Sequence, residues 1–192
     1  MQRILLALAA LLPTLALAHT GGDAGAHHGF MEGFTHPFTG LDHMAAMIAV
    51  GVWSTLSFHD KGRMLWAVPA AFAGLLLIGG LASFGGLELP FVEPVIAASL
   101  VVLGLLVATR VKMPVAAGAA LVGAFAIFHG VAHGSELPAE QAAAALSGMV
   151  LGTLILHLTG MALGRFVLDR HVWLPRIAGI GVALFGASLL AF

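Results

Sequence analysis

The sequence predicts an all-α, polytopic membrane protein: a six-helix transmembrane bundle that follows a cleaved signal peptide. Of its 192 residues, 60% are hydrophobic and 9% are charged, against roughly 25% charged residues in an average soluble domain. The mean hydropathy of +1.03 excludes a soluble or a disordered chain. Six apolar segments of near-spanning length are separated by short polar breaks, and in lipid a helix satisfies all its own backbone hydrogen bonds.

Residues 1–18 have the pattern of a secretory signal peptide. Arg3 precedes the apolar run 4–12, and Ala16 and Ala18 provide the small residues of a cleavage site. We expect the mature chain to begin at His19, outside the cytoplasm. The alternative is an uncleaved first helix, although this apolar run is shorter than the roughly 20 residues that cross a bilayer.

A lead-in rich in Gly and His, residues 20–39, contains no long apolar run. After it we expect six helices in one bundle, so that residues 19–192 form a single domain. Gly and Pro in the short breaks end the helices. The expected helices span residues 40–58, 64–84, 92–109, 114–132, 138–163 and 173–192. In the fifth, the pairs Gly148/Gly152 and Gly160/Gly164 predict close helix packing.

The charged residues predict the orientation of the bundle. Every Lys and Arg after Arg3 falls in or beside the connections that follow the first, third and fifth helices, which the positive-inside rule assigns to the cytoplasm. All acidic residues except Asp60 and Asp169 fall toward the other end. We expect a multi-pass protein of the bacterial inner membrane whose mature N- and C-termini are both periplasmic. Its acidic outer end attracts cations, and a net charge of −1 offers no basic excess for a nucleic-acid partner.

Ten His and no Cys make histidine the focus of the functional prediction, because ionisable residues are costly inside a membrane. The first cluster is His36-Pro-Phe-Thr-Gly-Leu-Asp42-His43, at the outer start of the first helix. A capping role explains Asp42 alone, but it does not explain two imidazoles that flank the same carboxylate. Met47 lies four residues after His43, on the same helical face.

The second cluster lies at the outer end of the fourth helix. His129 and His133 are four residues apart, so one helical face presents both imidazoles to a shared ion. Glu136 continues that face if the helix extends past Gly134.

The expected topology brings both clusters to the outer leaflet. The predicted metal site consists of His36, Asp42, His43, His129, His133 and Glu136. Glu93, at the outer start of the third helix, is either a further ligand or an ordinary helix-start acid. Imidazoles and carboxylates without a thiolate suit Ni²⁺, Co²⁺ or Zn²⁺ better than Cu⁺ or Mg²⁺.

Two further His have other assignments. His157, inside the fifth helix, is either a buried residue bonded across the bundle or a second station on an ion path, and Met47 is a candidate for the same path. His19, as the mature N-terminus, offers an α-amine and an imidazole to a metal, unless the lead-in is simply a mobile tail.

The two His motifs and the segment Met-x2-Met-x2-Val-Gly-x-Trp53 resemble the HupE/UreJ family of hydrogenase and urease accessory membrane proteins. The resemblance extends over essentially the whole chain. Members of the family are regarded as nickel permeases, with some relatives assigned to cobalt. The resemblance therefore implies a metal-recognition role for the two clusters and a link to the maturation of a nickel hydrogenase or urease, but the motif does not fix the metal.

The resulting prediction is an inner-membrane permease with no resident cofactor, whose substrate is a divalent ion, Ni²⁺ first and Co²⁺ or Zn²⁺ as alternatives. The chain has no Gly-x4-Gly-Lys-Ser/Thr motif, so it does not itself hydrolyse ATP. The competing interpretation is an intramembrane metal- or haem-binding enzyme or subunit. Against a zinc protease, His129 lacks the adjacent Glu of a His-Glu-x2-His motif.

Overall fold

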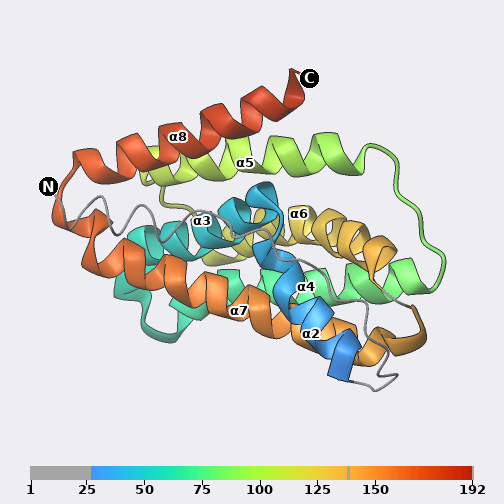
Figure 1. Ribbon diagram of the computed structural model, residues 1–192. Helices are drawn as coiled ribbons and strands as arrows, with labels where there is room; N and C mark the ends of the chain where they lie inside the picture. Colours follow the sequence, from blue (N-terminus) through green and yellow to red (C-terminus); the bar gives the residue numbers. More distant parts are fainter. Residues whose placement is uncertain (1–26, 138, 192) are drawn as a thin grey trace, which may run out of the picture.

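The computed structural model describes residues 27–137 and 139–191, and its regular structure within these ranges is entirely helical (Figure 1). Six of the described helices are long and apolar enough to cross a membrane, which confirms the expected fold class. They are α3 (Leu41–Phe58), α4 (Ala67–Phe84), α5 (Val92–Thr109), α6 (Val115–Glu136), α7 (Ala142–Phe166) and α8 (Trp173–Leu190). The expected signal peptide, residues 1–18, lies outside the described residues.

The most consequential boundary difference is at the end of α6, which we expected at residue 132. The helix continues through Gly134 to Glu136. Gly134 stays helical because it packs against α4, where an added Cβ would lie 2.8 Å from the Gly80 carbonyl oxygen. Here glycine allows a close helix contact and does not end the helix.

Two other boundaries shift because short 3₁₀ helices occupy the connections. The helix η3 (Ala139–Gln141) precedes α7, and η2 (His59–Trp66) precedes α4, so both long helices start a few residues later than expected. Within η2, Gly62 has a φ of 58°, a left-handed value that favours glycine. A further 3₁₀ helix, η4 (Leu168–Arg170), lies between α7 and α8.

The lead-in contains a helix that the sequence analysis did not predict. It is α2 (His27–Thr35), which continues into the 3₁₀ helix η1 (His36–Phe38). Phe30 and Phe34 are four residues apart and their ring centroids lie 6.3 Å from each other, so the helix has one aromatic face. Gly33 brings the backbone of α2 against the carbonyl of Ala145 in α7. This packing stabilises a helix that the polar, Gly-rich composition of the lead-in concealed.

Together, α2, η1 and α3 form one broken helix that runs parallel to α7 in chain direction, because its contacts advance from Phe30 to Ile48 as those of α7 advance from Gly148 to Gly160. At one end of α7, a Cβ added to Gly148 would lie 2.1 Å from the Phe30 carbonyl oxygen of α2. Farther along, a Cβ on Gly160 would lie 2.1 Å from the Ile48 carbonyl oxygen of α3. The expected close packing at these glycines is therefore present. The break between η1 and α3 consequently lies against the middle of α7, where Gly152 contacts η1.

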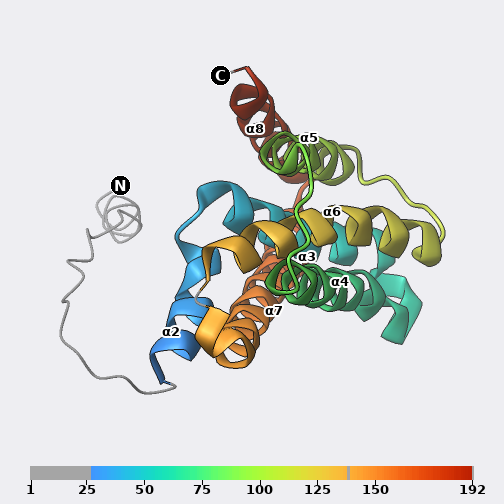
Figure 2. The ribbon, with the colours of Figure 1, turned by 90° about the vertical axis from the view of Figure 1, so that its right-hand side faces the viewer.

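The two ends of the bundle differ in charge. The connections α4–α5 and α6–α7 lie on the right in Figure 1, at what we call the site end. Within the described residues, every Lys and Arg lies in or beside the connections at the opposite, basic end. There, Arg110 and Asp169 form an ion pair. Figure 2 shows α8 beside α5 at one edge of the molecule, and α8 is the least buried of the six long helices.

Candidate metal centre

The break before α3 positions the first His cluster. Pro37 lies in the first turn of η1, Gly40 separates η1 from α3, and Asp42 lies in the first turn of α3. His36 precedes this break and His43 follows it. Because the chain turns between them, both side chains line one cavity of about 320 Å³ at the site end.

The last turns of α6 position the second cluster. His129 and His133 are buried, with 0% and 1% of their surface exposed, and Glu136 is exposed one turn beyond His133. The continuation of α6 through Gly134 is what keeps Glu136 on this side of the helix. The carbonyl end of α6 also faces this region, and the negative end of a helix dipole favours a cation.

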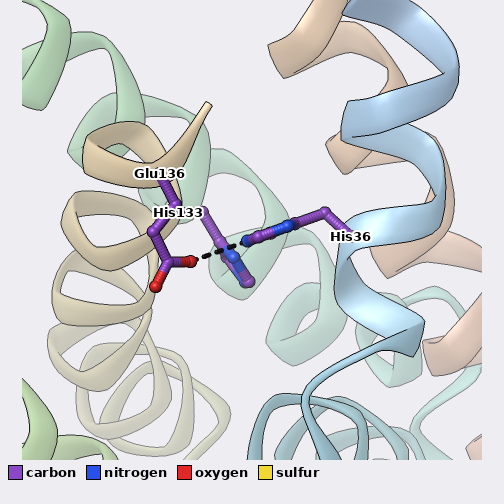
Figure 3. Close-up of side chains that lie close together, drawn as sticks. All are labelled: His36, His133 and Glu136. Atoms are coloured by element: carbon purple, nitrogen blue, oxygen red, sulfur yellow. Dashed lines mark hydrogen bonds and ion pairs between the residues drawn. The ribbon is translucent and has the colours of Figure 1, made fainter. Parts of the chain in front are cut away.

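The two clusters meet in space (Figure 3). The Nε2 atom of His36 lies 2.8 Å from the Oε2 atom of Glu136. The ring centroid of His133 lies 4.8 Å from that of His36 and 4.3 Å from that of His43. One donor atom from each of His36, His133 and Glu136 lies within 4.8 Å of the other two, so a single metal ion fits among them after small side-chain movements.

Hydrogen bonds fix which nitrogen is free in two of the rings. The Nδ1 of His43 lies 3.0 Å from Asp42 Oδ1, and the Nδ1 of His129 lies 3.0 Å from the Phe125 carbonyl oxygen. A carboxylate or carbonyl oxygen only accepts, so each Nδ1 donates its hydrogen and each Nε2 keeps a lone pair. Both Nε2 atoms are buried without a partner among the described residues. This arrangement is typical of metal-ligating imidazoles.

The ring of His133 contacts those of His36 and His43, and its side chain makes no hydrogen bond in the described chain. Both of its ring nitrogens are buried and unpartnered. A buried polar group without a partner costs roughly 1–3 kcal/mol. A structural role for His133 therefore does not explain this arrangement, whereas a bound cation would supply the missing partner.

Carboxylates complete the surroundings of the cavity. Asp42, Glu93 and Glu136 line it. The three histidines of the same cavity are His36, His43 and His133. Glu93 and Glu136 also line a larger adjoining depression of about 580 Å³, which includes Glu88 of the α4–α5 connection. Neither cavity has a Lys or Arg among its lining residues. The whole entrance therefore has a negative potential that concentrates cations.

Comparison with known proteins identifies the family. The sequence profile of the HupE / UreJ protein family matches residues 6–189. This chain belongs to the HupE/UreJ family. It is also 45% identical, over 194 residues, to Protein HupE of Rhizobium leguminosarum bv. viciae, with 98% of this chain and 97% of that relative covered. No solved structure matches the chain. The resemblance carried by the two His motifs is confirmed.

In this HupE/UreJ protein the candidate path residues lie deeper than the cavity. Met47 is fully buried and does not line it. Its carbonyl oxygen accepts a hydrogen bond from Nδ1 of His157, at 2.8 Å. His157 is thus bonded across the bundle, which is one of the two expected alternatives, yet its Nε2 remains unpartnered within the described chain. His19 lies outside the described residues, and its role stays a prediction.

One residue beside the HupE/UreJ His clusters was not singled out from the sequence. Phe72 of α4 is fully buried, and its ring centroid lies 5.4 Å from that of His129 and 5.1 Å from that of His157. In an apolar helix a single Phe carries no signal that distinguishes it from other core residues. Only the packing of α4 against α6 and α7 reveals its position between two imidazoles.

Proposed function

We propose that this HupE/UreJ protein is an inner-membrane permease that captures a divalent transition-metal ion, with Ni²⁺ as the preferred substrate, and passes it to the cytoplasm. The observation that carries the proposal is the convergence of three buried imidazoles with unpartnered Nε2 atoms, those of His43, His129 and His133. Carboxylates line the cavity beside His43 and His133, and the ring of His129 contacts that of His43. The sequence has no Cys, so the donors are imidazoles and carboxylates without a thiolate, a set that suits Ni²⁺, Co²⁺ or Zn²⁺.

The charge distribution supports uptake from the periplasm. The described Lys and Arg residues are confined to the basic end, which the positive-inside rule assigns to the cytoplasm. The site end, with its acidic entrance, is then periplasmic, and so are the mature N- and C-termini. An ion would enter past Glu88 and Glu93. In the cavity, imidazole nitrogens and carboxylate oxygens would replace its water ligands.

The membrane potential is sufficient to drive this uptake. An inside-negative potential supplies about 2.3 kcal/mol per charge per 100 mV, so a divalent ion gains roughly 4.6 kcal/mol. The sequence contains no ATP-binding loop of the Gly-x4-Gly-Lys-Ser/Thr type. We therefore propose passive, potential-driven transport. The family's link to hydrogenase and urease, two nickel enzymes, supports Ni²⁺ over Co²⁺ or Zn²⁺ as the substrate.

The experiment is uptake of radioactive nickel into proteoliposomes, with unlabelled cobalt, zinc and copper as competitors. We expect saturable nickel uptake that cobalt inhibits most strongly, because its size and ligand preference are closest to those of nickel. His171→Ala is the matched control, because His171 is an exposed histidine at the basic end. Stoichiometric nickel binding without any flux would contradict the permease. A haem absorption band in the purified protein would instead favour the haem-binding alternative.

A further inference from the structure

We propose that His157 and Thr153 form a second metal station inside the bundle, separated from the outer centre by the ring of Phe72. This inference rests on the proposed permease function and extends it, because it assigns the next position of the ion after the outer centre. It is carried by two buried polar groups of α7 and by the contacts of one aromatic ring.

The His157 ring is held so that one nitrogen is available to a ligand. Its Nδ1 donates to the Met47 carbonyl oxygen, at 2.8 Å, which leaves the lone pair on Nε2. The residue is only 1% exposed, yet this Nε2 has no hydrogen-bond partner among the described residues. The bond to Met47 uses only Nδ1. A role in packing across the bundle therefore does not explain why a second ring nitrogen, Nε2, is buried without a partner among the described residues.

Thr153 provides a second donor on the same helix face. It lies four residues before His157, one turn nearer to the site end, and is fully buried. Its hydroxyl oxygen has no hydrogen-bond partner in the described chain. Two unpartnered polar atoms therefore lie one turn apart in an otherwise apolar interior.

Phe72 separates this pair from the outer centre. Its ring centroid lies 5.4 Å from that of His129 and 5.1 Å from that of His157, so one aromatic ring contacts both imidazoles. An ion that leaves Nε2 of His129 must displace or pass the Phe72 ring to reach His157. Aromatic faces attract cations, so this barrier is passable for an ion that has lost its water.

The same face of α7 leads onward to the basic end. Met161 lies one turn beyond His157 and lines a cavity of about 380 Å³ there, together with Thr55 and Arg165. The Met161 thioether is a soft donor that borderline ions accept. Arg165 disfavours a resting cation in that cavity, so the ion would leave it for the cytoplasm. Thr153, His157 and Met161 thus form a row of oxygen, nitrogen and sulfur donors between the two ends.

The test compares His157→Leu with His157→Met, two apolar replacements of similar volume that both lose the bond to Met47. We measure nickel uptake into proteoliposomes and, separately, the nickel Kd of the detergent-purified variants. The inference predicts that His157→Leu lowers uptake at least tenfold but changes the Kd of the outer centre less than twofold. His157→Met, which restores a metal donor, should recover a measurable part of the flux.

Full uptake by His157→Leu, or equal uptake by the Leu and Met variants, would overturn the second station. If His157→Leu melts at a lower temperature, the isosteric Thr153→Val variant replaces it, with an expected loss of threefold or more in uptake and an unchanged Kd. Uptake by Thr153→Val equal to wild type would also overturn the inference. If the permease proposal itself fails, the wild-type protein shows no nickel flux, whereas failure of this inference leaves wild-type flux intact.

Discussion

His43 and His133 come from different halves of the chain, yet their ring centroids lie 4.3 Å apart. One follows the break before α3 and the other occupies the last turns of α6. The contact exists because α2, η1 and α3 form a broken helix along α7, and because α6 remains helical to Glu136. This contact unites the two His clusters into one candidate centre.

A shared centre predicts strong non-additivity between the two clusters. We expect His43→Ala and His129→Ala each to lower nickel uptake at least tenfold, and the double variant to be little worse than either single one. Residues that hold one ion lose the same interaction when either is removed. Initial uptake rates in proteoliposomes measure this coupling. If the two losses multiply as independent factors, the imidazoles do not share an ion.

The contact between His36 and Glu136 predicts a role for the carboxylate charge. Glu136→Gln keeps the side-chain size and removes the negative charge beside His36 Nε2. We expect nickel affinity to fall at least tenfold in equilibrium dialysis. Glu140→Gln is the control, because Glu140 is exposed in η3 and does not line the metal cavity. Equal affinity of the two variants would exclude Glu136 as a ligand.

Asp42 is expected to act through His43. Its carboxylate accepts the Nδ1 hydrogen of that ring and so holds the Nε2 lone pair toward the centre. Removal of such a partner lowers metal affinity about 10- to 100-fold, and we expect this loss for Asp42→Ala. Asp60→Ala, at the basic end, should leave the nickel Kd unchanged. A Kd for Asp42→Ala within twofold of wild type would show that His43 needs no orientation by this carboxylate.

Glycine packing along α7 predicts a clear stability difference. A Cβ added at Gly160 would lie 2.1 Å from the Ile48 carbonyl oxygen, whereas one added at Gly74 of α4 would meet nothing within 4 Å. Gly160→Ala must therefore separate α3 from α7, and we expect a marked fall in melting temperature in detergent. Gly74→Ala should melt at or above the wild-type temperature, because Ala is the better helix former. Similar melting temperatures for both variants would contradict this packing.

Much of the architecture is predictable from the sequence because the bilayer restricts it. A spanning helix needs a certain length and apolarity, and α5 spans the residues expected for it, 92–109. The order of helices then brings His36 and His129 to the same end without any knowledge of packing. Composition and topology are therefore sufficient to predict the six long helices and the location of the candidate residues at one common end of the bundle.

Side-chain packing explains what the sequence did not reveal. The helix α2 lies with its backbone, at Phe30 and Gly33, against Gly148 and Ala145 of α7, a contact that the polar composition of the lead-in concealed. In the sequence, Gly134 is typical of a helix end, and only its contact with Gly80 explains why α6 continues. Phe72 is one apolar residue among many until α4 places it between His129 and His157. Each of these features is a contact between distant segments, and hydrophobic pattern does not encode such contacts.

The central claim is that the imidazole and carboxylate centre around His133 captures an ion that the membrane potential then drives inward. The measurement is the initial rate of radioactive nickel uptake by proteoliposomes at an imposed inside-negative potential, for the wild-type protein and for His133→Ala. We predict that wild-type uptake rises with the potential and that His133→Ala loses at least nine-tenths of it, while His171→Ala retains it. Equal potential-driven uptake by wild type and His133→Ala would contradict the account.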